Sequence, residues 1–465
     1  MEKHTVAIIG GGPGGYVAAI RLQQYGIDTV VFEKERLGGV CLNWGCIPTK
    51  TLVKIADLFS ELHHVDEFGL SIKNPIYDYS KIYERKNQVV EKLVSGVEFL
   101  FKKRKIPVIN EAVKILEKHG DSYLISTENL TIQASYVIIA TGSKPKGLPA
   151  FKIDGENILS SKDILKLQDL PKRLTIVGGG VIGCEFASIF AQLDVEVQIV
   201  EFLPQLISTE DKEISKRLAM ALKRVGIKIN LNTAVESWKS VNGELRLSLS
   251  NGKEITTDKV LLSVGRDPVF DIECKNFDIT KNKNAITINN DFETNEKNLF
   301  AIGDVTAKMM LAHTASKQGL LTTEIIKNRI EGINSKFDEL RYENIPRCTF
   351  TNPEIGSVGL TEAQAKEKYE EILVGKFPFS ANGKALGLGN VFGFVKTIAE
   401  AKSKKLVGMH IIGPQATELI AEGGIIIQSG MTIDEALKIV FAHPTLSEAV
   451  AESIEDLEKM SINSM

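Results

Sequence analysis

Apolar and polar positions at the start of the chain predict a strand, a helix and a second strand. The β-branched run from Thr5 to Ile9 is typical of a buried strand. Apolar residues then recur at helical spacing until Gly26, and the run from Thr29 to Phe32 predicts the next strand. Strands that alternate with helices form parallel sheets covered by helices. The N-terminal part is therefore expected to be an α/β domain.

The same order of elements returns later in the chain. A strand is predicted from Leu174 to Val177, a helix from there through Leu193, and a further strand from Val195 to Val200. This internal repeat predicts a second α/β domain built on the plan of the first.

Glycines follow the first strand of each repeat, and an acidic residue ends the second strand. Glu33 and Glu201 both lie 23 residues after the first glycine of their repeat. Such glycines allow a tight turn and a close approach of the backbone to a pyrophosphate, and the acid accepts hydrogen bonds from a ribose. One GxGxxG alone is weak evidence, but the full arrangement found twice predicts two dinucleotide sites of the Rossmann type. The glycines are Gly10, Gly12 and Gly15 in the first repeat and Gly178, Gly180 and Gly183 in the second.

Directly behind the first repeat, residues 38 to 50 read GGVCLNWGCIPTK, with Cys41 and Cys46 close together. A regular helix would place their Cα atoms about 8.6 Å apart, beyond the roughly 7 Å limit for a disulfide. Gly45 and Pro48 therefore predict a distorted turn that leads into a helix. Two merely structural cysteines are the alternative, but their place next to a dinucleotide site favours a redox-active pair.

The type of each dinucleotide follows from its surroundings. A dithiol behind the first site favours a flavin there. At the second site Glu201 would repel the 2′-phosphate of NADP, and residues 202 to 209 contain no Lys or Arg to bind it. The sequence therefore predicts FAD in the first site and NAD in the second.

Composition sets modest limits on the class of protein. The chain has 465 residues, a formal net charge of −3 and 43% hydrophobic residues. The basic run from Lys102 to Lys105 lacks interleaved aromatic residues, so no nucleic acid is expected as a partner. The longest apolar stretches are far short of the ~20 residues that span a bilayer, so no membrane is expected either. No metal site is expected. Residues 1 to 4 lead straight into a strand, which predicts a cytoplasmic protein, or one of the mitochondrial matrix if a presequence has been removed. In such a reducing compartment the three other cysteines are expected to be unpaired thiols: Cys184, Cys274 and Cys348.

Further motifs follow in a fixed order, and together with the dithiol they resemble those of the pyridine nucleotide-disulfide oxidoreductases. They are VIIATGSKP at 137 to 145, LLSVGRDP at 261 to 268, LFAIGDVT at 299 to 306 and AHPTLSEA at 442 to 449. The resemblance implies an α/β fold with two Rossmann-like domains and a C-terminal α+β interface domain. The implied boundaries are 1–145 for the FAD domain, 146–272 for the NAD domain, 273–343 for a central domain and 344–465 for the interface domain.

Roles for single residues are also implied by this resemblance. Cys41 is similar to the thiol that exchanges with the substrate, and Cys46 to the one that lies against the flavin. Lys50 resembles a lysine that contacts the flavin and pairs with an acid at the position of Glu185. Asp304 resembles the aspartate that binds the ribityl chain. Further cofactor contacts are implied at Ala112, Thr141, Gly142 and Gly265.

The motif HPTLSE holds the remaining catalytic pair, His443 and Glu448. An imidazole can take a thiol proton near neutral pH, and a carboxylate on its other nitrogen fixes the tautomer. In the family the histidine precedes a cis proline and serves the dithiol of the other subunit. The resemblance therefore implies a homodimer.

The activity implied is the reoxidation of protein-bound dihydrolipoamide to lipoamide with reduction of NAD to NADH. The implied partners are lipoylated acyltransferases of 2-oxoacid dehydrogenase complexes or the H-protein of the glycine cleavage system. Glutathione-type reductases are disfavoured because they use NADPH, and mercuric reductases because no cysteine follows Cys348. A flavoprotein that is only a scaffold is a further alternative, but it would have no use for a dithiol and an acid-base pair.

Overall fold

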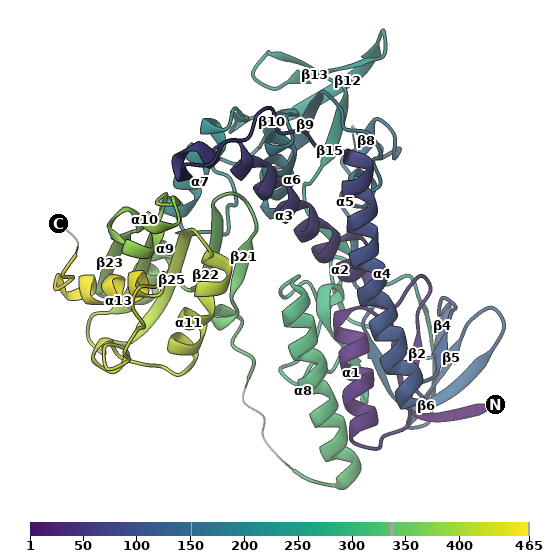
Figure 1. The fold of residues 1–465 in the computed structure, drawn as a ribbon. Coiled ribbons are helices and arrows are strands. Elements are labelled where there is room, and N and C mark those ends of the chain that lie inside the picture. The colour runs from purple at the N-terminus through teal and green to yellow at the C-terminus, as the bar shows by residue number, and fades with distance from the viewer. Residues whose placement is uncertain (150, 335–338, 464–465) are drawn as a thin grey trace. The chain divides into compact units, whose positions relative to one another are not determined.

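The computed structural model describes residues 1–149, 151–334 and 339–463, coloured along the chain in Figure 1. The chain forms two compact units, each made of segments that are distant in sequence. The first unit contains residues 1–51, 81–146 and 265–340, and the second contains 52–80, 147–264 and 341–465.

The first unit is built on a mixed sheet whose central strand is β1 (Glu2–Ile9). This strand pairs in parallel with β2 (Thr29–Phe32) on one side and β6 (Thr131–Ile139) on the other. Val6, Ala7 and Ile8 are fully buried, because helices and loops cover both faces of a parallel sheet. The predicted strands and the helix between them are confirmed. The strand order is β17-β4-β5-β6-β1-β2-β3, and β20 also pairs with β6.

Two helices of this unit, α1 (Pro13–Gln24) and α8 (Ala312–Glu331), pack closely, and Figure 1 shows them side by side. A Cβ at Gly319 would lie 2.7 Å from the carbonyl oxygen of Gly14, so the contact requires glycine. The other elements are α2 (Gly39–Trp44), α3 (Cys46–Leu62), α4 (Tyr79–Arg104), β3 (Val108–Ile109), β4 (Ile115–His119), β5 (Ser122–Ser126), β7 (Ser143–Pro145), β16 (Arg266–Pro268), β17 (Glu273–Lys275), β18 (Lys281–Asn282), β19 (Ala285–Ile286) and β20 (Leu299–Ala301); α3 and α4 also extend into the second unit.

The second copy of the sequence repeat lies in the second unit, where its strands belong to a parallel sheet of order β11-β10-β9-β15-β8. Its β9 (Arg173–Val177), α6 (Val181–Gln192) and β10 (Glu196–Val200) match the three predicted elements. A three-stranded antiparallel sheet follows in the chain. The remaining elements of this part are β8 (Ile158–Leu159), α5 (Ser161–Ile164), α7 (Lys212–Arg224), β11 (Lys228–Asn230), β12 (Val235–Val241), β13 (Glu244–Leu249), β14 (Glu254–Thr257) and β15 (Lys259–Leu262).

The C-terminal part of the second unit is an antiparallel sheet of order β21-β22-β25-β24-β23. Helix α11 (Ala416–Gln428) packs on β22 and β25, where a Cβ at Gly356 would lie 2.3 Å from a backbone oxygen of the helix. Helix α13 (Glu448–Glu455) packs on β23 and β24. The expected fold class, α/β with two Rossmann-like domains and a C-terminal α+β domain, is confirmed. The bounds are β21 (Arg347–Thr349), β22 (Glu354–Gly359), α9 (Glu362–Lys368), β23 (Ile372–Pro378), α10 (Gly383–Gly387), β24 (Phe394–Glu400), β25 (Leu406–Gly413) and α12 (Ile433–Ala436).

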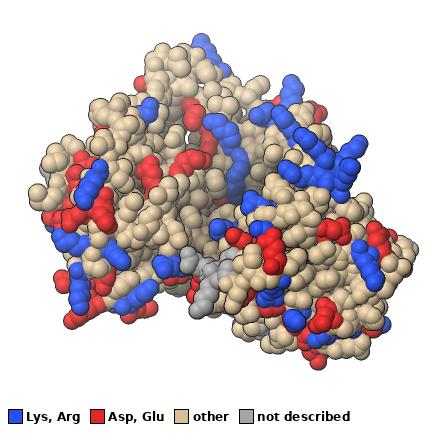
Figure 2. Space-filling model, turned by 90° about the horizontal axis from the view of Figure 1, so that it is seen from below, with Lys and Arg blue, Asp and Glu red and all other residues tan. Residues whose placement is uncertain are grey.

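Figure 2 shows acidic and basic side chains on the face in view, with several basic side chains gathered at its upper right. The formal net charge of the chain is −3. Among the described residues, no helix is both long and apolar enough to cross a membrane.

Candidate active site

The first glycine-rich loop connects β1 to α1. A Cβ at Gly10 would lie 2.3 Å from the carbonyl oxygen of Ala140, and one at Gly15 would lie 1.8 Å from that of Gly10. These two glycines are therefore required by packing. Gly12 differs, because a Cβ there would meet nothing closer than 3.9 Å. The middle glycine leaves open space at the N-terminus of α1, where the backbone N–H groups of a helix favour a pyrophosphate.

The second loop, between β9 and α6, repeats this geometry. A Cβ at Gly178 would lie 2.5 Å from the carbonyl oxygen of Ser263. A Cβ at Gly183 would lie 2.1 Å from the carbonyl oxygen of Gly178. A Cβ at Gly180 would have no neighbour within 4 Å. Both loops thus fit the dinucleotide sites that the sequence predicts.

Replacing Gly180 by alanine is expected to raise the KM for NAD about tenfold, or about 1.4 kcal/mol of binding, because the added methyl group fills the space left for the pyrophosphate. Folding should be unaffected, since the φ of Gly180 is an ordinary −74°, close to the −71° of its counterpart Gly12. Steady-state kinetics with varied NAD check this, with the exposed Gly147→Ala as the control. An unchanged KM in the Gly180 variant would place the pyrophosphate elsewhere.

Glu33 and Glu201 organise the two loops in the same way. Glu33 accepts hydrogen bonds from the N–H groups of Gly11 at 2.8 Å and Glu35 at 2.7 Å. Glu201 accepts them from Gly179 and, at 2.7 Å, from Leu203. Each carboxylate is thereby fixed at the end of its strand, next to the glycine loop, with lone pairs left for ribose hydroxyls.

The two cysteines of the dithiol motif lie on consecutive helices. Helix α2 carries Cys41 and ends at Trp44. The next residue, Gly45, has a φ of −142° and a ψ of −108°, which interrupt the helical path, and α3 begins at Cys46. The predicted break in the helix is confirmed. A Cβ at Gly45 would lie 2.8 Å from the carbonyl oxygen of Val40, so this turn requires glycine.

The side chains of Cys41 and Cys46 are in contact. The hydrogen bond to Cys46 raises the pKa of Cys41 most, and burial and the charge of Cys46 raise it further. The ammonium of Lys50 acts in the opposite direction and lowers this pKa. Lys50 lies one helical turn after Cys46 on α3. The motif therefore brings a cation to the thiol pair, as a reactive thiolate requires.

Tyr16 is a neighbour of the dithiol that the sequence analysis missed. Burial raises the pKa of its hydroxyl, and the charges of Cys41 and Cys46 raise it further. Tyr16 follows Gly15 of the first glycine loop directly. This position was the only signal in the sequence that could have pointed to it.

A polar cluster around Asp304 lies in the same unit. Ser143 donates a hydrogen bond to the Asp304 carboxylate, and Arg266 donates to the hydroxyl and the carbonyl oxygen of Ser143, both at 2.7 Å. Burial lowers the pKa of Arg266, while the charges of Asp304 and Cys46 act in the opposite direction. Ser143 and Arg266 belong to the ATGSKP and GRDP motifs, but the sequence alone did not assign them a role.

The other predicted flavin contacts lie on loops of this unit. The hydroxyl of Thr141 donates a hydrogen bond to the carbonyl oxygen of Val269. The N–H of Val269 donates to the carbonyl oxygen of Gly142 at 3.0 Å. Gly142 and Gly265 have positive φ angles of 73° and 112°, and a Cβ at either would meet nothing within 4 Å. Ala112 is exposed between β3 and β4. The contacts of these residues with a cofactor stay a prediction.

His443 and Glu448 form a close pair in the second unit. The Nδ1 of His443 lies 2.7 Å from Oε1 of Glu448, whose Oε2 accepts the N–H of Thr445 at 2.8 Å. Burial raises the pKa of Glu448, but these two hydrogen bonds outweigh it and lower the pKa overall. The peptide between His443 and Pro444 is cis, as predicted. Nδ1 is thus held by the carboxylate, which leaves Nε2 for proton transfer.

Glu185, predicted to pair with Lys50, lies on α6 and is buried. Its Oε1 accepts the N–H of Phe350 at 3.0 Å. The pairing with Lys50 stays a prediction. Elsewhere, the Cys184 thiol contacts the carbonyl oxygen of Gly179, and burial raises the pKa of Cys274 to about 11. In the part of the chain that is described, no group of three or more His, Cys, Asp or Glu side chains could hold a metal ion.

Comparison with known families gives two matches. The profile of the pyridine nucleotide-disulphide oxidoreductases matches residues 4–319, and that of the dimerisation domain of these enzymes matches residues 345–454. Together the two matches cover most of the chain, and the dyad of His443 and Glu448 lies within the second.

Curated proteins and solved structures agree with these matches. A dihydrolipoyl dehydrogenase of Bacillus subtilis is 38% identical over 97% of both chains, and a mitochondrial dihydrolipoyl dehydrogenase of Pisum sativum is 37% identical over 97% of this chain and 91% of that protein. The structure of LpdA from Mycobacterium tuberculosis has a similar fold, with a TM-score of 0.87 at 22% identity over 98% of this chain and all of that one. The flavoprotein disulfide reductase RclA of Escherichia coli has a TM-score of 0.84 at 26% identity over 97% and 99%.

Proposed function

Because the chain belongs to the pyridine nucleotide-disulphide oxidoreductase family, we propose that it oxidises dihydrolipoamide and reduces NAD, as a dihydrolipoyl dehydrogenase. The observation that carries the proposal is the contact between Cys41 and Cys46, beside Lys50 and in the same unit as the first glycine loop. A thiol pair in this setting can form a disulfide, accept two electrons from a dithiol and pass them on.

The reaction begins with the two cysteines joined as a disulfide. His443 takes a proton from one thiol of dihydrolipoamide, and the resulting thiolate attacks Cys41. The Cys41 to Cys46 bond breaks, and Cys46 leaves as a thiolate. The second lipoyl sulfur then attacks the lipoyl sulfur of the mixed disulfide, its proton passes to the departing sulfur of Cys41, and lipoamide is released. Two electrons have moved from the substrate to the protein dithiol, one proton is held by His443 and the other by Cys41.

FAD, when bound, supplies the two-electron carrier between this dithiol and NAD. Gly12 would leave room for its pyrophosphate, Glu33 would accept hydrogen bonds from a ribose, and Asp304 would accept them from ribityl hydroxyls. Gly180 would leave the corresponding room for NAD, and Glu201 would bind its ribose. The carboxylate of Glu201 favours NAD over NADP.

Each active site is expected to need two copies of the chain. The match to a dimerisation domain includes His443, and the side chain of His443 is 79% exposed, so its own chain leaves it accessible to a second copy. We infer that the dyad of one subunit serves the dithiol of the other in a homodimer. The natural substrates are then lipoyl groups on acyltransferases or H-proteins, in the cytoplasm or the mitochondrial matrix.

A comparison of substrate pairs tests the proposed function. The flavin-loaded protein should turn over dihydrolipoamide with NAD at least about 10³-fold faster, per KM, than glutathione disulfide with NADPH, because a site built for one substrate rejects the other strongly. Higher activity with the glutathione pair would replace the proposal with a reductase function. Inactivity with both pairs in a flavin-loaded dimer would contradict it altogether.

A further inference from the structure

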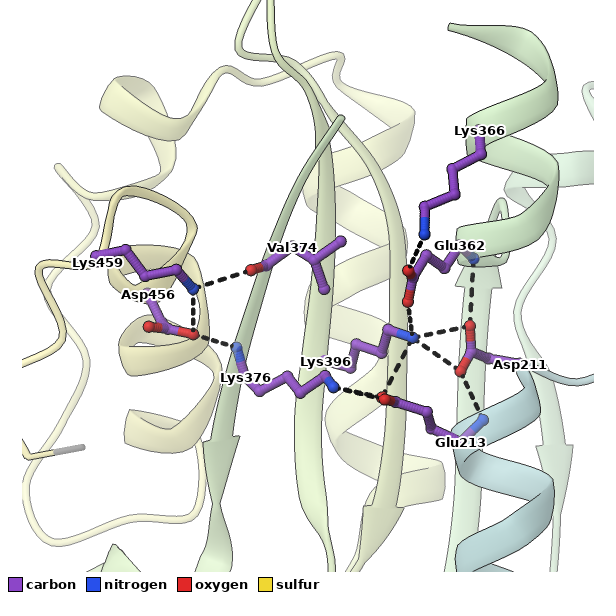
Figure 3. A network of polar contacts seen from close by, with 9 residues as sticks. All are labelled: Asp211, Glu213, Glu362, Lys366, Val374, Lys376, Lys396, Asp456 and Lys459. Atoms are coloured by element: carbon purple, nitrogen blue, oxygen red, sulfur yellow. Dashed lines mark hydrogen bonds and ion pairs between the residues drawn. The ribbon is translucent and has the colours of Figure 1, made fainter. Parts of the chain in front are cut away.

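A lysine buried in the second unit is surrounded by three carboxylates, as Figure 3 shows. Lys396 lies on β24, and its side chain is 1% exposed. Its Nζ lies 3.0 Å from Oδ1 and 3.1 Å from Oδ2 of Asp211, 2.7 Å from Oε2 of Glu362 and 3.3 Å from Oε2 of Glu213. Asp211 and Glu213 belong to the segment that carries the second glycine loop, whereas Lys396 and Glu362 belong to the dimerisation domain. The lysine therefore joins two parts of the chain.

The charges of this cluster are balanced. Lys366 pairs with Glu362 at 2.6 Å, and Lys376 pairs with Glu213 at 2.6 Å, so three ammonium groups face three carboxylates. Burial lowers the pKa of Lys396, but its hydrogen bonds to Glu362 and Asp211 outweigh this and raise the pKa overall. Lys396 therefore stays charged. Buried ion pairs contribute little net stability but fix one geometry, so the cluster is suited to positioning.

What the cluster fixes is the start of α7. Asp211 is the N-cap of this helix and accepts the N–H of Glu213 at 3.0 Å. The N–H of Glu362 also donates to Asp211, at 3.2 Å. The residue before the cap, Glu210, accepts a hydrogen bond from Arg347 of the dimerisation domain at 3.1 Å. Two buried carboxylates in sequence are thus held by two cations of the other domain.

From α7 the contacts continue to the second glycine loop. Leu206 and Ile207 are buried just before the cap, and the hydroxyl of Ser215 on α7 donates to the carbonyl oxygen of Leu206 at 2.6 Å. The N–H of Ile207 donates to the carbonyl oxygen of Gly179 at 2.8 Å. A Cβ at Gly179 would lie 2.5 Å from the side chain of Leu206, so the loop and residues 206–207 are in tight contact. Gly179 immediately precedes Gly180, where the pyrophosphate fits.

We infer that Lys396 is a positioning residue for NAD, which holds the glycine loop of the second dinucleotide site through Asp211 and residues 206–207. The inference rests on the proposed function only in taking NAD as the ligand of that loop. The dimerisation domain thereby takes part in NAD binding without contacting the dinucleotide. Removal of the ammonium leaves Asp211 buried and without its cation, and the start of α7 and the loop attached to it shift.

The test compares two variants of the full-length, flavin-loaded protein. Lys396→Met removes the cation, and Asp211→Asn removes its partner's charge while keeping a residue that caps helices well. Both should raise the Kd for NADH, measured by calorimetry, and the KM for NAD about tenfold, or about 1.4 kcal/mol. The kcat at saturating NAD and the anaerobic reduction of the flavin by dihydrolipoamide should stay within about twofold of the parent, since neither depends on the loop's affinity. Lys404→Met, which removes a single ion pair with Glu458 in the same domain, is the control and should change none of these values.

The outcomes separate this inference from the proposed function. Unchanged NADH affinity in folded variants would overturn it, as would a fall in kcat with an unchanged KM. If Lys396→Met does not fold, Asp211→Asn decides the matter alone. A parent protein that binds NADH but does not oxidise dihydrolipoamide would refute the proposed function and leave the NADH binding test of Lys396 intact.

Discussion

Replacing Cys46 by serine is expected to lower the oxidation of dihydrolipoamide by at least about 10³-fold, because the members of a catalytic unit fail together when one is lost. Cys41→Ser should have the same effect, since neither cysteine alone can accept two electrons as a disulfide. The measurement is the steady-state rate of NADH formation from dihydrolipoamide and NAD. In both variants the flavin should stay bound, because the glycine loop at Gly12 and the cluster at Asp304 are untouched.

The spectra of the two variants should differ. With Cys41→Ser the thiolate of Cys46 is kept, and it should give long-wavelength absorption against the flavin, whereas Cys46→Ser should give none. Cys274→Ser is the control, because Cys274 lies on β17 and is no part of the dithiol. Identical spectra for the two variants would contradict the separate roles of the sulfurs, and full activity in either variant would contradict the dithiol mechanism.

Replacing His443 by glutamine is expected to lower dihydrolipoamide turnover by about 10² to 10⁴-fold, the usual contribution of a general base. The Nε2 that would take the thiol proton is lost, while the dinucleotide sites are unchanged. Electron transfer from NADH to an artificial flavin acceptor should stay within about twofold of the parent rate, since no thiol proton is moved in that reaction. Both rates can be measured on the same preparation.

His64→Gln provides a matched control, because His64 is an exposed histidine with a neighbouring acid, Glu67, but lies outside the dyad. It should leave both rates unchanged. If His443→Gln lowers the two rates equally, the residue is structural, and the assignment as a base is wrong. Glu448→Gln should show the same selectivity with a smaller loss, since the imidazole is kept and only its orientation is weakened.

The sequence predicted the structure best where the conformation of a segment depends on residues within that segment. The strand from Thr29 to Phe32 is observed with the predicted bounds, because a continuous β-branched and aromatic run suits a strand buried on both faces. The break at Gly45 also followed from local reasoning, since a regular helix would hold Cys41 and Cys46 too far apart. The family relationship predicted from the ordered motifs is confirmed by the matches over most of the chain.

Contacts between distant segments could not be predicted in this way. Lys396 lies in a run, GFVKTIAE, that is typical of a strand, and nothing nearby in the sequence shows that its partners are Asp211 and Glu362. The contacts of Arg266 with Ser143 likewise join motifs separated by the whole second repeat. Such pairings depend on the tertiary fold, which a periodic pattern of apolar residues does not specify.

The dithiol of Cys41 and Cys46 is expected to transfer electrons from dihydrolipoamide to the flavin and on to NAD. Anaerobic titration of the flavin-loaded protein with dihydrolipoamide tests it most directly. One equivalent per subunit should produce the long-wavelength absorption of a thiolate against the flavin, and addition of NAD should remove it with formation of an equal amount of NADH. A spectrum that dihydrolipoamide does not change, in a protein that binds flavin and is reduced by NADH, would contradict the account.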